Sequence, residues 1–120
     1  MFEDCDLISQ YTRQQALEDG VLIDLSASYP EECKIYRYPV ACTQSVWAII
    51  ECAAEKKLGS FKGIVGDLLW MSQKGIIRKL SESTMIFCVI LGIKGHNLKV
   101  MIGPADDMSP CVTVMLEGED

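Results

Sequence analysis

The sequence has few of the features that mark several common classes of protein. It contains one histidine, no C-x-x-C pair, and no apolar run near the ~20 residues of a membrane-spanning helix. It also lacks an excess of basic residues, because 11 lysines and arginines stand against 17 aspartates and glutamates, for a formal net charge of −6. Direct binding to nucleic acid needs a basic face. The charge therefore argues against that class and leaves room for basic protein partners.

Motifs that hold phosphates or drive nucleophilic catalysis are also missing. Glycines occur in "KGIVG" and "GIKGHN", but without the spacings of a P-loop or of a dinucleotide-binding turn. A catalytic triad would have to use His96, for which "KGHN" predicts an exposed turn. We therefore expect no catalytic residue and no cofactor, and we do not expect an enzyme.

Six cysteines are spread along the chain without close pairs. The sequence opens on no basic segment followed by an apolar run and a small-residue cleavage site, so nothing marks it for secretion. Disulfides are rare in cytoplasmic proteins, and structural zinc sites usually bring their ligands in close pairs. We therefore expect a soluble cytoplasmic protein whose cysteines are buried thiols, with Cys52 on the apolar face of a helix.

The first third of the chain predicts a short helix followed by a strand. Thr12 and Gln15 have the spacing of a capping box, and Gly20 is the expected left-handed stop, which gives a helix over Arg13–Asp19. The apolar run that follows predicts a strand over Val21–Ser26. The next segment, "ASYPEECKIYRYPV", holds two prolines and no clear period, so a loop is expected.

Two longer helices precede a change of period. Apolar residues at three- and four-residue steps predict helices over residues 44–57 and 61–80, the first of them capped by Thr43. "TMIFCVILGI", "LKVMIG" and "CVTVML" predict a C-terminal three-stranded antiparallel meander. The expected fold class is α+β, with two longer helices and one short helix packed on a small antiparallel sheet. Residues 1–120 are expected to form a single domain with residues 1–8 as a loose N-terminus.

Acidic residues gather on both sides of the last predicted strand. They are Asp106, Asp107, Glu117, Glu119 and Asp120. A straight strand separates the two groups by roughly 30 Å at about 3.3 Å per residue, so they do not form a compact catalytic pair. Two interpretations stay open: a dispersed negative face that meets a basic partner, or a solvated turn and tail.

Trp70 is a large aromatic residue on the polar side of its predicted helix, next to Met71 and near Asp67. Such a position is typical of a contact site. The alternative is that the meander or the "YRYPV" loop covers the ring. Trp47, by contrast, is expected in the core.

Three stretches carry a resemblance to a known family: "YTRQQALEDGVLIDLS", "RYPVACTQSVW" with the later "DLLWM", and "MIGPADDMSPCVTVMLEGED". In them the chain resembles a family of small proteins of unknown function carried by phages, prophages, plasmids and integrative elements. The resemblance implies a mobile-element origin but no mechanism. The positions that match the family pattern are Tyr11, Arg13, Asp19, Gly20, Asp24, Arg37, Tyr38, Pro39, Trp47, Trp70, Gly103, Asp106, Asp107 and Asp120.

The leading hypothesis is a small, acidic, non-enzymatic interaction protein of a phage or mobile element. It would inhibit a host nucleic-acid-targeting defence, such as CRISPR or restriction, by binding a host protein with a basic surface. It would contact neither nucleic acid nor membrane directly, and its oligomeric state stays open, a homodimer included. Its partner-binding residues would be Asp106, Asp107, Glu117, Glu119, Asp120, Asp67 and Trp70.

Two other functions stay open. One alternative to the leading hypothesis is binding or sequestration of a small ligand such as a nucleotide signal, with Arg37, Tyr38 and Trp70 stacking on the base and clamping a phosphate. The other alternative is metal-dependent catalysis, for which the metal ligands would be Asp24, Asp67, Asp106 and Asp107.

Overall fold

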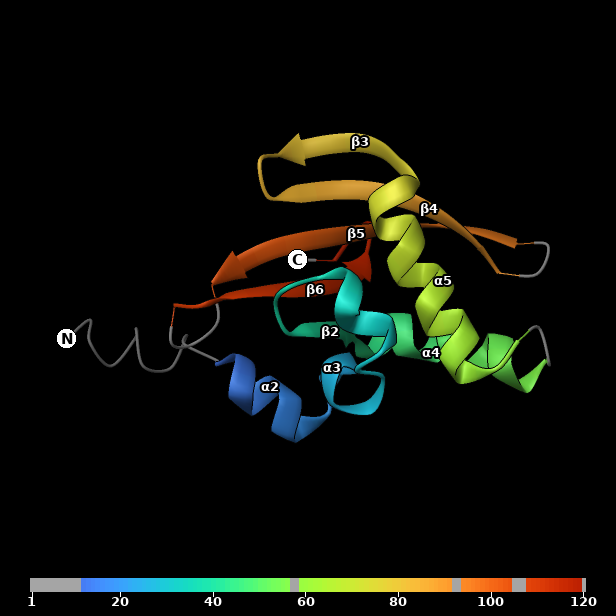
Figure 1. Ribbon diagram of the computed structural model, residues 1–120, viewed down its shortest axis with the longest axis horizontal. Coiled ribbons are helices and arrows are strands. Elements are labelled where there is room, and N and C mark those ends of the chain that lie inside the picture. Colours follow the sequence, from blue (N-terminus) through green and yellow to red (C-terminus); the bar gives the residue numbers. More distant parts are fainter. Residues whose placement is uncertain (1–11, 57–58, 92–93, 105–107, 120) are drawn as a thin grey trace.

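The computed structural model describes residues 12–56, 59–91, 94–104 and 108–119. It has an α+β fold, as the sequence predicts (Figure 1). Among the described residues, no helix is long and apolar enough to cross a membrane. The elements are α2 (Arg13–Asp19), β1 (Leu22–Asp24), α3 (Leu25–Ser28), η1 (Glu32–Ile35), β2 (Val40–Thr43), α4 (Gln44–Glu55), α5 (Phe61–Lys74), β3 (Ile76–Ser81), β4 (Thr84–Leu91), β5 (Lys94–Pro104) and β6 (Pro110–Leu116).

A six-stranded sheet runs through the molecule in the order β1-β2-β6-β5-β4-β3. Strands β4, β5 and β6 form the predicted antiparallel meander. The sheet is larger than predicted and mixed, because β2 pairs parallel with β6 while the other neighbours are antiparallel. The parallel pair is possible because α4 and the later elements carry the chain from one strand to the other.

The two longer helices cover one face of this sheet, and the core lies between them and the strands. Helix α4 packs on β1, β2 and β6, whereas α5 packs on β4 and the start of β3. Each fully buried apolar side chain in this layer contributes about 1.5–3 kcal/mol. Trp47 is only partly buried at the edge of the core, where Phe61 stacks on it at 5.5 Å between ring centroids. The fully buried contributors include Val46, Ile50, Leu68, Leu69, Phe87, Leu98, Val100, Val112 and Val114.

The first helix is confirmed with the predicted bounds. Thr12 and Gln15 form the reciprocal capping box, and Gly20 has the left-handed conformation at φ 80°. The strand after Gly20 is shorter than predicted, because Asp24 ends β1 and caps α3 with its carboxylate.

The predicted loop before residue 40 is partly wrong. It contains the 3-10 helix η1 and ends in β2, which is buried in the middle of the sheet. Ser26 explains how the segment is held, because its hydroxyl accepts a hydrogen bond from the Val40 backbone N–H at 2.7 Å. β2 is too short for a periodicity to be recognised, so the sequence pattern missed it.

The predicted helix over residues 61–80 is wrong beyond Lys74. Gly75 caps α5, and Ile76–Ser81 form β3, which pairs antiparallel with β4. A Cβ on Gly75 would lie 2.8 Å from the Cys88 carbonyl oxygen, so only glycine allows the helix and β4 to approach this closely. The β-branched pair Ile76 and Ile77 then favours a strand over further helix.

The predicted turn at "KGHN" is also wrong. His96 lies inside β5 opposite Val89, and residues 92–93, between β4 and β5 in the sequence, lie outside the described residues. Partial burial lowers the pKa of His96, and the nearby positive charge of Lys94 lowers it further. The imidazole is therefore neutral at pH 7.

Candidate functional site

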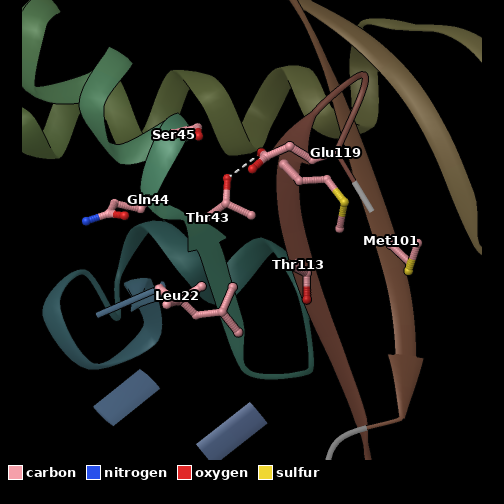
Figure 2. Close-up of a pocket in the computed structure, with 9 residues that line it drawn as sticks. Leu22, Thr43, Gln44, Ser45, Met101, Thr113 and Glu119 are labelled. Carbon is pink, nitrogen blue, oxygen red and sulfur yellow. Dashed lines mark hydrogen bonds between the residues drawn. The ribbon is translucent and has the colours of Figure 1, made fainter. Parts of the chain in front are cut away.

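An open cavity of about 400 Å³ lies on the sheet face opposite α4 and α5, beside the start of α4 (Figure 2). Thr113 and Met115 point to this face because their neighbours Val112 and Val114 point into the core. The cavity has both polar and sulfur-containing walls. Its lining residues are Val21, Leu22, Thr43, Gln44, Ser45, Met101, Thr113, Met115 and Glu119.

Glu119 closes one side of this cavity. Its Oε1 accepts a hydrogen bond from the Thr43 hydroxyl at 2.7 Å (Figure 2). The same oxygen accepts a second hydrogen bond from the Leu116 backbone N–H at 2.8 Å. Thr43 is also the N-cap of α4, where its oxygen accepts from the Val46 N–H. These hydrogen bonds fasten the last turn of the described chain, at Glu117 and Gly118, to the start of α4. The helix dipole also favours a negative charge at this end of α4.

Two cationic side chains lie against the same sheet face. Lys99 is 9 % exposed, and its ammonium group donates a hydrogen bond to the Glu119 backbone carbonyl. Arg13 reaches from α2 and donates to the Thr113 hydroxyl at 2.6 Å and to the Val112 carbonyl at 3.1 Å. These contacts satisfy charged groups that have lost water, and they tie α2 and the last turn to the sheet.

The acidic residues predicted to meet a partner have different surroundings. Glu119 is held within the chain, whereas Glu117 is exposed and forms an ion pair with Arg78 at 3.0 Å. An exposed ion pair contributes only ~0–1 kcal/mol, so Glu117 can still exchange its partner. Asp106, Asp107 and Asp120 lie outside the described residues.

The outer face of α5 presents Trp70 to solvent with 55 % of its surface exposed. The meander and the "YRYPV" loop therefore leave most of the residue open. The Lys74 ammonium lies 5.4 Å from the ring centroid, which is a cation–π contact. Asp67 is exposed one turn earlier on the same side of the helix. Trp70 and Asp67 thus form the part of the predicted partner-binding set that the structure places together on one surface.

The three residues predicted to bind a nucleotide do not line the cavity. Arg37 and Tyr38 are exposed in the loop between η1 and β2, and Trp70 lies on α5. The loop and the helix are on the same side of the molecule, since the Gln73 side chain donates to the Ile35 carbonyl at 3.2 Å. The cavity is on the other face of the sheet.

The carboxylates considered as metal ligands are used differently. Asp24 accepts a hydrogen bond from the Ala27 N–H at the start of α3, and Asp67 is exposed on α5. Asp106 and Asp107 lie outside the described residues. Within the described ranges, no group of three or more His, Cys, Asp or Glu side chains could hold a metal ion.

The described cysteines are free thiols, and Cys33, Cys42 and Cys111 are buried, as expected. Burial raises the pKa of Cys42 to about 12 and also raises that of Cys33. Both are therefore protonated, and weak nucleophiles, at neutral pH. Cys52 is exposed, so the prediction that it lies on the apolar face of α4 is wrong. The face of α4 that is buried consists of Val46, Ile50 and Ala53.

Sequence reasoning missed the roles of Lys99 and Glu119 and the contact of Arg13 with β6. A signal for Lys99 was present, because it alternates with Leu98 and Val100 and must therefore point to the other sheet face. Glu119 carries no such signal, since its hydrogen bond to Thr43 joins residues 76 positions apart.

A family model described as "Family of unknown function (DUF6573)" matches residues 1–120. Comparisons with curated proteins and with solved structures found no match. The family match includes all three stretches that carry the resemblance to small proteins of unknown function.

Proposed function

The chain belongs to this family of unknown function, and we propose that it is a small non-enzymatic interaction protein of a phage or other mobile element. It acts in the host cytoplasm by binding a protein of a nucleic-acid-targeting defence, such as CRISPR or restriction. The observation that carries the proposal is the exposed Trp70 beside the exposed Asp67 on the outer face of α5. Tryptophan is enriched among the residues that contribute most to protein–protein binding, because it buries a large area with few rotatable bonds.

The partner has a basic surface. The chain carries a formal net charge of −6, which speeds association with a positively charged protein and opposes direct contact with nucleic acid. Asp67 supplies negative charge beside Trp70 on α5. Glu119 does not take part, because its carboxylate is bound to Thr43 and Leu116.

A plating assay tests this function. Bacteria that carry one defined CRISPR or restriction system express the chain and are challenged with a phage which that system targets. We expect phage plating to recover in at least one system, and we expect Trp70→Ala to abolish the recovery. Purified protein should then bind the effector of that system, with an association rate that Asp67→Lys lowers and makes less dependent on salt.

Tyr38→Ala is the matched control, because it also removes an exposed aromatic side chain. It should leave the recovery intact if the outer face of α5 is the contact. Unchanged recovery with Trp70→Ala, in a variant that still folds, would overturn the assignment of this surface. Lack of recovery in every CRISPR and restriction class tested would overturn the anti-defence function itself.

Binding of a small ligand is the second candidate, and the cavity beside Glu119 favours it. About 400 Å³ lies within the ~300–1,000 Å³ typical of small-molecule sites. Its lining carries a carboxylate and hydroxyl groups, so it suits a ligand with hydrogen-bond donors better than a phosphate. A thermal shift with nucleosides but not with nucleotides, lost in Thr113→Val, would support it, whereas no shift with either class would count against it.

A further inference from the structure

The outer edge of the sheet at β3 differs in charge from the rest of the molecule. Residues 74–79 contain Lys74, Arg78 and Lys79 and no acidic residue, so three of the chain's 11 lysines and arginines fall in this short segment. The chain as a whole has a net charge of −6. The segment is therefore basic along the chain, and two of its cations, Arg78 and Lys79, form exposed ion pairs with Glu117 and Glu82.

β3 is also an open edge. It is the terminal strand of the sheet, all six of its residues are exposed, and within the described ranges no strand pairs with its outer side (Figure 1). Ile77 is 58 % exposed and Leu80 is 50 % exposed. An edge of this kind offers unpaired backbone N–H and C=O groups to an added strand, and its side chains set which strand is accepted.

Two register shifts in β3 limit which strands can pair with it. The register against β4 shifts between Ile76 and Arg78 and again between Lys79 and Ser81, and such bulges interrupt a regular ladder. Between the shifts, Arg78 and Lys79 stand in regular register opposite Ile86 and Met85. The regular part of the edge is thus its most basic part.

A second copy of the chain pairs poorly with this edge in the three most central antiparallel registers. Antiparallel pairing of two β3 strands about their centre puts Arg78 opposite the Lys79 of the other copy. A shift by one residue puts Arg78 opposite Arg78, or Lys79 opposite Lys79. Like charges that are directly opposite destabilise a strand pair, so self-pairing is disfavoured in each of these registers.

We propose that β3 is a docking edge for an extended segment of a partner protein that carries two adjacent carboxylates between apolar residues. The carboxylates lie opposite Arg78 and Lys79, and the apolar residues pack on Ile77 and Leu80. The ion pairs that now involve the two cations are exposed: Arg78 with Glu117 at 3.0 Å and Lys79 with Glu82 at 3.6 Å. Because exposed pairs contribute little, an incoming carboxylate can replace either acid at small cost.

This inference goes beyond the proposed function and uses another surface, so it is tested with purified protein and a synthetic peptide. The probe is a short fluorescent peptide with two central glutamates flanked by valine and threonine; its control has lysines in place of the glutamates. We expect the glutamate peptide to bind, to slow hydrogen exchange of β3 amides, and to bind more weakly as salt is raised. The lysine peptide should not bind.

Lys79→Glu should weaken binding of the glutamate peptide at least about tenfold, equivalent to ~1.4 kcal/mol. Lys62→Glu is the matched control, because Lys62 is also an exposed lysine with one loose ion pair, to Glu32 at 3.9 Å, at the opposite end of α5. It should bind as the unaltered protein does. Lys79→Thr, which removes the charge without reversing it, should give an intermediate loss, and thermal unfolding shows that each variant is folded.

Equal binding of both peptides, protection of amides outside β3, or no binding at the highest soluble concentration of peptide would each overturn the docking edge. The plating assay is independent of these results. If the chain protects phages through Trp70 but does not bind the glutamate peptide, the proposed function is supported and the β3 docking edge is wrong. If the chain binds the glutamate peptide at β3 but does not protect phages, the docking edge is supported and the proposed function is wrong.

Discussion

At the scale of single residues, the two described glutamates of the last turn stand in different surroundings. Glu119 accepts two hydrogen bonds and joins the end of β6 to the start of α4, while Glu117 is exposed and paired with Arg78. In the sequence they look alike, as acids two positions apart. The difference comes from what surrounds them, so the two should respond differently to substitution.

Glu119→Ala should lower the free energy of unfolding by about 1–3 kcal/mol, because it leaves the Thr43 hydroxyl and the Leu116 N–H without their acceptor. Glu117→Ala should cost only ~0–1 kcal/mol, since it removes one exposed ion pair. Urea unfolding of the two variants measures both values. Equal losses would contradict the fastening role of Glu119.

The buried thiol of Cys42 predicts a loss of stability at alkaline pH. Its pKa is raised by burial from 9.0 to about 12 in the folded state, so above pH 9 the unfolded chain releases this proton while the folded protein keeps it. The contribution of Cys42 to the free energy of unfolding is therefore fully present below pH 9. It decreases as the pH rises toward 12, by up to ~1.4 kcal/mol per pH unit. In Cys42→Ala this contribution is absent, while Cys33 and Tyr36, whose pKa values are also raised, remain. Urea unfolding between pH 8 and about 11 should show the shallower decline in the variant.

At the scale of elements, the junction between α5 and β3 decides how large the sheet becomes. Gly75 ends the helix, and its own carbonyl accepts a hydrogen bond from the Cys88 N–H at 3.1 Å, which starts the pairing of β3 with β4. The Met71 side chain and the backbone of β4 occupy the space around Gly75 into which a Cβ atom would project. A side chain there has no room unless the helix and the strand separate.

Gly75→Ala should therefore destabilise the protein by ~1–3 kcal/mol, the usual cost of an overpacked substitution. The closest fixed obstacle is the Cys88 carbonyl oxygen at 2.8 Å from the added Cβ, and backbone yields less than a flexible side chain. Gly103→Ala is the control, since an added Cβ there meets nothing within 4 Å. Thermal unfolding compares the two, and equal midpoints would show that the close approach at residue 75 costs nothing.

At the scale of the whole molecule, the sheet has a short, partly buried edge at β1 and a longer, fully exposed edge at β3. The exposed edge combines apolar side chains with two adjacent cations. Charge on an edge strand is a common protection against association through the edge. The association state of the protein should therefore depend on Arg78 and Lys79.

Replacing both cations with threonine, Arg78→Thr with Lys79→Thr, should promote self-association, because threonine favours strands and the like-charge repulsion is gone. The unaltered protein should elute as a 13.3 kDa monomer under the same conditions. Light scattering after size exclusion measures both masses over a range of concentrations. Lys34→Thr with Lys62→Thr removes the same charge elsewhere and should leave the mass unchanged.

The sequence by itself determined the features that depend on neighbours in the chain. Local spacing in the sequence predicts the capping box at Thr12, the helix stop at Gly20, the cap at Thr43 and the C-terminal meander. Each of these predictions is confirmed. Net charge and the missing motifs likewise follow from composition. These features are readable because their physical causes act over a few residues.

Only the tertiary structure decided which residues of similar sequence character are exposed and which are bound. In the structure Glu119 holds the end of β6 to the start of α4, and Trp70 is exposed. Ile76–Ser81 form an edge strand where the sequence predicts a helix, and β2 pairs with β6. Each outcome depends on groups far apart in the sequence, such as Thr43 with Glu119 or Gly75 with the backbone of β4. Such contacts leave no period in the sequence, because they are selected by packing in space and not by spacing along the chain.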